Sequence, residues 1–107
     1  MFLAHVTGHV VATQKVATMV GRKLLVVEPL RLDESSRDRL RGTGRTQVAV
    51  DSLGAGVGQV VLVCQGSSAR LTPETGDLPI DAVVIGIVDS VGIGDRMVFG
   101  ADTEVAR

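Results

Sequence analysis

Apolar residues along this chain gather in short, valine-rich segments that polar or glycine-containing stretches separate. Side chains branched at Cβ favour strands, and apolar runs of this length between turn residues are typical of strands. Several such strands at short intervals favour a small barrel or sandwich, so we expect an all-β fold in one domain over residues 1–100. The predicted strands cover residues 2–13, 23–32, 46–53, 59–65, 80–91 and 96–99.

The segments between the strands predict turns and little helix. Gly8 interrupts the first strand, where we expect a bulge or a bend. Residues 15–22 fit a loop or a single helical turn. The Gly66–Arg70 segment predicts a short helix with Ser67 or Ser68 as its N-cap, because a serine hydroxyl accepts a bond from the free amides at a helix start.

The most polar stretch is the segment 33–45, which is rich in arginine and also holds three acidic residues. We expect a solvated hairpin loop there, with a short helix begun by Asp33 or Ser35 as a variant. A basic recognition patch is the alternative, and the interspersed acidic residues disfavour it. The last residues, 101–107, are predicted to form a flexible tail.

Two predicted strands are apolar on both faces. Successive side chains of a strand point to opposite faces, so a small barrel in water should alternate apolar and polar positions. Val60–Cys64 and Ala82–Val88 do not alternate. One face of each strand then fills the interior and the other needs an apolar cover, for which a partner subunit is the economical answer. The pattern therefore predicts an oligomer without specifying the number of subunits.

Composition and charge exclude several classes of partner. The chain has 107 residues, a net charge of −1, two phenylalanines and neither tryptophan nor tyrosine. Proteins that bind nucleic acid use basic surfaces and stacking aromatics, so we expect no nucleic-acid partner. No apolar run approaches the roughly 18 residues of a membrane helix, and we expect no membrane association and no signal peptide. The single Cys64 suits a reducing cytoplasm, and it is interpreted as a small buried side chain.

The glycine-rich segment Gly54–Gly58 does not fit a phosphate-binding loop. A dinucleotide-binding loop requires a helix after its glycines, whereas a strand is predicted here, and the Lys-Ser/Thr of a Walker loop is absent. A tight turn between strands, which needs positive φ or close backbone approach, explains these glycines.

Catalytic and metal-binding groups are not evident. His5 and His9 lie four residues apart on one predicted strand, but a third zinc ligand is missing nearby. A hydrolase triad from Ser67 or Ser68 with a histidine and Asp51 lacks the nucleophile elbow that such enzymes use. We therefore expect no catalytic residues, no cofactor and no metal.

In order and spacing, a series of segments resembles the EutN/CcmL family, whose members form the vertices of bacterial microcompartment shells. The match runs from about Phe2 to Val91, and its most specific part is the run AVDSLGAGVGQVVLV followed by GSSAR. The segments that carry it are Val10–Thr13 with Lys15, Lys23–Val27, Ala49–Asp51, Leu53–Gly58, Val60–Val63, Gly66–Arg70, Asp81–Ala82 and Gly86–Asp89.

The resemblance implies a closed, OB-like β-barrel of five to six strands with one short helix, assembled as a homopentamer. It implies a structural protein of the shell in the cytoplasm, which closes the five-fold vertices of a shell tiled by hexamers. Hexameric and trimeric shell proteins are the implied partners, and encapsulated enzymes are a further candidate. The competing hypotheses are an OB-fold-like oligomer that binds single-stranded nucleic acid or a small molecule, and an enzyme or allosteric pentamer that uses its axis or its subunit clefts.

The resemblance also places individual residues. The loop of Gly54, Ala55, Gly56, Val57 and Gly58 is expected near the five-fold axis, where five copies crowd. Ala55→Leu is then expected to weaken assembly or block the axis. Residues expected at the subunit interface are Ser67, Ser68, Arg70, Asp81 and Asp89, with Arg70 paired to a carboxylate within or across subunits. The sequence departs from the family pattern in a longer 33–45 segment and in Gln59, where many members carry an acid.

Overall fold

The computed structural model describes residues 1–100 and 105 of the chain, so the predicted tail at 101–107 lies outside the described residues apart from Val105. The described structure is mostly β, with two short 3₁₀ helices, η1 (Ala17–Met19) and η2 (Gly66–Arg70). The strands are β1 (Phe2–Val10), β2 (Lys23–Leu32), β3 (Leu40–Gly42), β4 (Gln47–Asp51), β5 (Val60–Gln65), β6 (Ala82–Val88), β7 (Val91–Ile93) and β8 (Arg96–Phe99).

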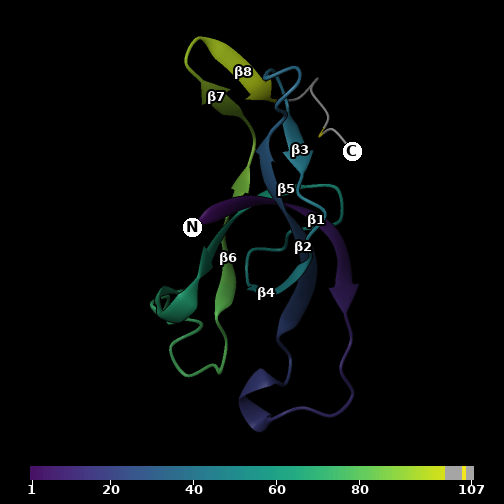
Figure 1. Ribbon diagram of the computed structural model, residues 1–107. Coiled ribbons are helices and arrows are strands. Elements are labelled where there is room, and N and C mark those ends of the chain that lie inside the picture. The colour runs from purple at the N-terminus through teal and green to yellow at the C-terminus, as the bar shows by residue number, and fades with distance from the viewer. Residues whose placement is uncertain (101–104, 106–107) are drawn as a thin grey trace.

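Five of the strands close on themselves in a ring. They follow the order β1-β5-β6-β4-β2, and a direct pairing of β1 with β2 completes the circle (Figure 1). The neighbours are antiparallel except for β4 and β6, which run parallel. Each of the five strands therefore pairs with a neighbour on both sides, which confirms the expectation of a small closed β structure.

The interior of the ring is a compact aliphatic core. Inward-pointing residues of all five strands meet there, and burying each of the valine and leucine side chains stabilises the fold by roughly 1.5–3 kcal/mol. Phe2 packs against the core from one end of the ring while remaining half-buried. The core residues are Ala4, Val6, Leu25, Val27, Ala49, Ala55, Val61, Val63, Ala82 and Val84.

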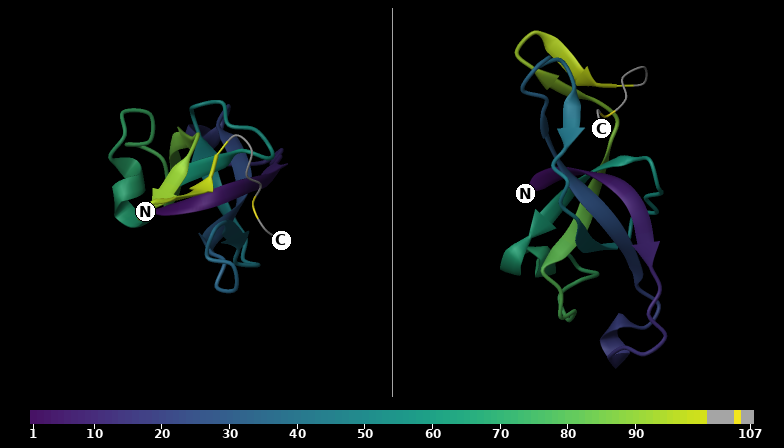
Figure 2. Two further views of the ribbon diagram at one scale, coloured as in Figure 1. Left: turned by 90° about the horizontal axis from the view of Figure 1, so that it is seen from above. Right: turned by 45° about the vertical axis from the view of Figure 1, so that its right-hand side comes forward.

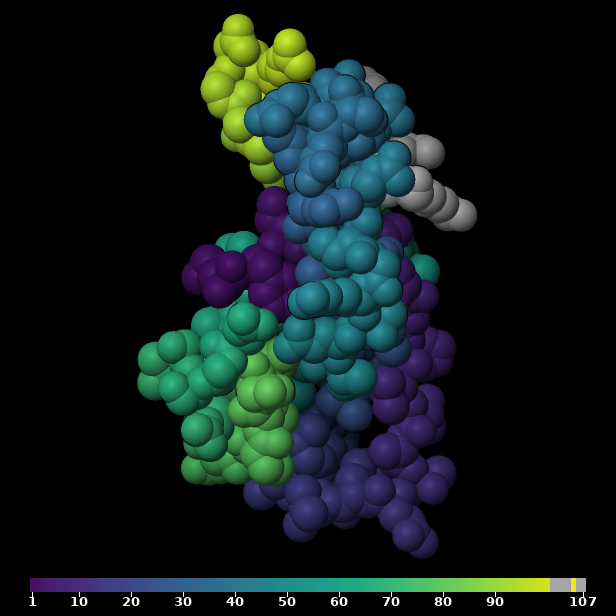
Figure 3. All heavy atoms as spheres, in the orientation of Figure 1, coloured from purple at the N-terminus to yellow at the C-terminus, as the bar shows by residue number. Residues whose placement is uncertain are grey.

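A second, smaller apolar cluster covers part of the outer face of the ring. Leu24, Val50, Val83 and Cys64 lie side by side on neighbouring strands. The segment 66–80 packs over them and forms a layer at the lower left of the molecule (Figure 3). The covering residues are Met19, Ala69, Leu78 and Ile80. The interpretation that only a partner subunit can cover the outer face is therefore wrong for this portion, because the chain covers it with its own loop.

The bulge predicted in the first strand is present, although β1 ends at Val10 and not at residue 13, whereas the long strand predicted at 80–91 is divided. The register of β1 against β2 shifts between Val6 and Gly8, which confirms the predicted bulge. Residues 80–91 are divided between β6, which ends at Val88, and β7, which begins at Val91. Strands β7 and β8 form a separate hairpin that projects from the same end of the ring as the β2–β3 connection (Figure 2). Gly94 adopts φ +62° in its two-residue turn, a conformation that side chains disfavour.

The polar segment 33–45 is more ordered than a solvated loop. Its middle forms β3, which continues the sheet by pairing Leu32 with Leu40, and Leu40 is buried. No helix begins at Asp33 or Ser35, because the carboxylate of Asp33 is engaged in closing the hairpin. The Ser35 amide donates to it at 3.2 Å, and the Arg41 guanidinium lies 3.3 Å away.

Asp33 gives the fold a pH-dependent contribution to stability. The hydrogen bond from Arg41, followed by that from the Ser35 amide, lowers the pKa of the Asp33 carboxyl to about 2 from its ordinary value of 3.8. A depressed pKa in the folded state adds stability above the unfolded value, and this is lost as the pH falls from 3.8 toward 2.

Asp33→Asn is therefore expected to be less stable than the wild type at neutral pH, with the difference shrinking across that acid range. Urea denaturation of both proteins at a series of pH values measures the difference. A gap between the two stabilities that persisted unchanged to pH 2 would contradict the assignment.

Candidate assembly site

The glycine-rich loop after β4 is fastened by a buried carboxylate. Asp51 ends β4 with its side chain fully buried. Its Oδ1 accepts the amide of Leu53 at 2.9 Å, and its Oδ2 accepts the amide of Ala55 at 2.8 Å. An aspartate that bonds an amide two residues later is a common means of starting a turn. Lys23, which is paired with Asp51 on the neighbouring strand, donates from Nζ to the Ala55 carbonyl at 2.7 Å.

The rest of the loop is held by backbone and amide bonds. The side-chain oxygen of Gln59 accepts the Gly56 amide at 2.8 Å, and the Gly58 amide donates to the Val6 carbonyl at 2.9 Å. A carboxylate at position 59 would accept the same bond from Gly56, so glutamine there preserves the loop without a charge. Gly54 and Gly58 adopt φ of +85° and +95°, which explains the need for glycine at both positions.

The loop turns one alanine inward and two apolar side chains outward. Ala55 is 0% exposed and belongs to the core of the ring, so its side chain is not available to line an opening. Leu53 and Val57 are 50% and 66% exposed. The position of the whole loop, Gly54 to Gly58, at a five-fold axis stays a prediction.

The residues predicted at the subunit interface all lie on the surface. Ser67 and Ser68 are exposed within η2, and Asp81 and Asp89 lie before and after β6. The N-cap of η2 is Gln65, with no hydrogen bond from a side chain, so the prediction that Ser67 or Ser68 caps this helix is wrong. The Gly66 amide, which has no partner within the helix, donates a hydrogen bond to the Asp81 carbonyl at 2.7 Å. A serine cap is therefore not needed for this amide.

The Arg70 side chain has no hydrogen-bonding or ionic partner among residues 1–100 and 105. The predicted pairing with a carboxylate of the same chain is therefore wrong for these residues. A partner carboxylate across subunits stays a prediction. A lone guanidinium on the surface is well hydrated and needs no partner in the single chain.

Apolar side chains remain exposed on β6 beyond the area that the segment 66–80 covers. Ile85 and Ile87 are 36% and 37% exposed, and Val48 on β4 is 48% exposed. The sequence indicated the apolar excess of these strands but not which positions stay uncovered. The structure adds Val48 and the half of β6 that follows Val84 to the candidate contact surface.

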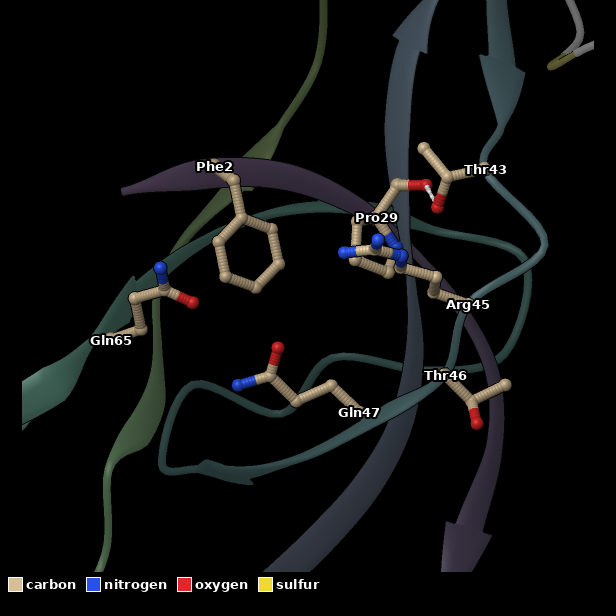
Figure 4. Close-up of a pocket in the computed structure, with 7 residues that line it drawn as sticks. All are labelled: Phe2, Pro29, Thr43, Arg45, Thr46, Gln47 and Gln65. Carbon is tan, nitrogen blue, oxygen red and sulfur yellow. Dashed lines mark hydrogen bonds between the residues drawn. The ribbon is translucent and has the colours of Figure 1, made fainter.

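A cavity of about 500 Å³ opens near the start of β1 and was not anticipated from the sequence. Its walls come from β1, β2, the end of β5 and the start of β4, and they mix the rings of Phe2 and Pro29 with polar side chains (Figure 4). Thr43 donates to the Pro29 carbonyl at 2.8 Å, which closes one side. No sequence motif marks this place, since its lining comes from four stretches that lie far apart in the sequence. The lining residues are Phe2, Pro29, Thr43, Arg45, Thr46, Gln47 and Gln65.

The groups considered for catalysis or metal binding are not brought together. Both oxygens of Asp51 bind the backbone of its own loop, whereas Ser67 and Ser68 are exposed on η2. His5 and His9 are separated by the bulge of β1, and no three potential metal ligands cluster within the described part of the chain. Among the described helices, none has the length and apolar character needed to cross a membrane.

The fold and its surface define a small all-β protein. Asp51 and Asp33 hold its loops through hydrogen bonds, and several apolar side chains remain exposed. The chain belongs to the EutN/CcmL family, described as ethanolamine utilisation protein EutN/carboxysome, whose model matches residues 1–89. The family expected from the sequence is confirmed.

Curated relatives extend over nearly the same length. The microcompartment shell vertex protein PduN of Salmonella typhimurium is 46% identical over 91 residues, which span 85% of this chain and 98% of the relative. The carboxysome shell vertex protein CcmL of Synechocystis is 39% identical over 99 residues, 92% of this chain and 93% of the relative.

Solved structures have the same fold. CcmL of Gloeobacter violaceus superimposes with a TM-score of 0.82 at 37% identity, covering 94% of this chain and 98% of that one. GrpN of Rhodospirillum rubrum, a pentameric microcompartment shell protein, gives a TM-score of 0.72 at 44% identity, covering 89% and 100%.

Proposed function

We propose that this chain is a non-catalytic shell vertex protein of a bacterial microcompartment in the cytoplasm, active as a homopentamer. The observation that carries the proposal is the match to named vertex proteins along almost their whole length, at up to 46% identity. The match spans 98% and 96% of the length of these two relatives, so it is not confined to a fragment of them.

The physical role of a pentamer follows from geometry. A flat layer of hexamers closes into a polyhedron only where five-fold units replace six-fold ones. A ring of five identical subunits uses head-to-tail contacts, in which one patch of a subunit meets a different patch of the next. The uncovered isoleucines of β6 are candidates for one such patch.

Within this proposal, the axis loop Gly54–Gly58 and the interface set Ser67, Ser68, Arg70, Asp81 and Asp89 keep their predicted places. Hexameric and trimeric shell proteins are the proposed partners, and encapsulated enzymes are secondary candidates. A net charge of −1 and two phenylalanines support a protein partner rather than a nucleic acid.

Co-expression with hexameric shell proteins tests the proposal. With this chain present, we expect closed polyhedral shells that contain it at the vertices. Without it, we expect open sheets, tubes or shells that lack their corners. Electron microscopy of purified particles distinguishes these products, and shells that closed equally well in its absence would refute the vertex function.

A further inference from the structure

We propose that Asp51 and Lys23 are a positioning pair, which locks the loop after β4 in one conformation so that Leu53 and Val57 contact a neighbouring copy of this chain. The inference rests on the proposed pentamer, and it names the residues that fix the conformation of a loop at the contact between its subunits. It adds a role for a charge pair whose carboxylate is buried, and it assigns the partner of two exposed apolar side chains.

The carboxylate of Asp51 does more than stabilise the end of a strand. Its side chain is 0% exposed, and both of its oxygens bind amides of the loop that follows, at Leu53 and Ala55. Other conformations of the loop are higher in free energy, because they leave the buried charge without its hydrogen bonds. The carboxylate therefore selects one loop conformation.

Lys23, on the neighbouring strand, holds the same loop through a second set of contacts. Its Nζ lies 3.7 Å from the Asp51 carboxylate and donates to the Ala55 carbonyl at 2.7 Å. The amide and the carbonyl of Ala55 are thus both held by this pair, and its methyl group is buried in the core. Three restraints on one residue fix the middle of the loop relative to the ring.

The two exposed apolar residues stand directly beside these fixed points. The amide of Leu53 is itself bonded to Asp51. Val57 lies between Gly56, whose amide is bonded to Gln59, and Gly58, whose amide is bonded to Val6. Apolar side chains on a rigid loop lose little conformational entropy on binding, which favours a contact that must be made at one angle.

A second copy is the partner that this arrangement fits best. A ring of five closes only if each contact repeats one fixed rotation, and a rigid apolar contact loop supplies such a restraint. Within residues 54–58, every residue other than Val57 and the inward-facing Ala55 is glycine, so copies can approach closely along the backbone.

The test compares Asp51→Asn and Lys23→Met with matched controls. Asp95→Asn and Lys15→Met make the same chemical changes at exposed positions in the β7–β8 turn and the β1–β2 loop. Mass photometry over a dilution series measures dissociation of the assembly. Amide hydrogen exchange measures opening of residues 52–58 separately from the core strands.

We expect each loop variant to raise the dissociation midpoint at least about tenfold over its control, because lost charge-assisted bonds are worth at least that factor. Exchange should rise at 52–58 while Val61 and Val84 in the core stay protected. Lys23→Arg, which restores a cation, should recover part of the assembly.

Two results would overturn the inference. In one, the loop variants dissociate at the same concentration as their controls. In the other, the core amides open as much as the loop, so that the pair merely stabilises the whole fold. If the wild type itself were not pentameric, the proposed function would fail first, and that failure is visible before any variant is made.

Discussion

Aspartate at both Ile85 and Ile87 is expected to dissociate the assembly into folded monomers. The two isoleucines are 36% and 37% exposed in the single chain, on the strand whose first half is already covered by the segment 66–80. In the assembly they would be buried by a neighbour, where each contributes part of the roughly 1.5–3 kcal/mol of a fully buried isoleucine. An unpaired carboxylate at such a contact also carries a desolvation penalty of several kcal/mol.

Together these effects should raise the dissociation constant of each contact by at least about a thousandfold. Native mass spectrometry reads the change in mass, and circular dichroism checks that the strands remain. The matched variant I85V/I87V, which stays apolar, should remain assembled. Ser36→Asp adds a charge in the β2–β3 loop and should also leave the mass of the assembly unchanged. A double aspartate variant that kept the wild-type mass on dilution would show that these isoleucines are not at the contact.

Ala55→Leu is expected to damage both folding and assembly. The methyl group of Ala55 is 0% exposed and lies in the core of the ring, so leucine must displace either its neighbours or the loop. Overpacking of this kind typically costs about 1–3 kcal/mol, which lowers the melting temperature by roughly 5–20 °C in a domain of this size.

Displacement of the loop also breaks the bonds of Ala55 to Asp51 and Lys23, so the pentamer should weaken as well. Ala17→Leu is the matched control, because it makes the same change at an exposed position in η1, away from the loop. Thermal denaturation and native mass spectrometry measure the two effects. An Ala55→Leu protein with an unchanged melting temperature would contradict the packing of this residue in the core.

The strands of the ring were predictable because their valine-rich runs and flanking glycines carry a local signal. The short strand β3 carries none: its residues are Leu40, Arg41 and Gly42, and it forms because Leu32 of the preceding strand pairs with Leu40 across the turn. A polar segment can be drawn into a sheet by its neighbours, and composition alone does not reveal this.

The second apolar cluster also escaped prediction. Ala69, Leu78 and Ile80 lie in a stretch broken by proline and glycine, with no strand or helix period to mark a buried face. Only the closed ring brings them over Val83. The sequence therefore overstated the area that a partner must cover.

The turn at Gly54–Gly58 was predicted from its glycines, but the hydrogen bonds that hold it in place were not. An aspartate directly before a glycine-rich turn is a recognisable signal, because its carboxylate bonds amides two or more residues later. The role of Lys23 depends on the register that pairs it with Asp51, and pairing between distant strands is not encoded locally.

The mass of the wild-type protein in dilute solution tests the central claim most directly. If identical neighbours cover the bare isoleucines of β6, native mass spectrometry at low micromolar concentration gives five times 11.2 kDa, about 56 kDa. A stable, folded species of 11.2 kDa under those conditions, with Ile85 and Ile87 in water, would contradict it.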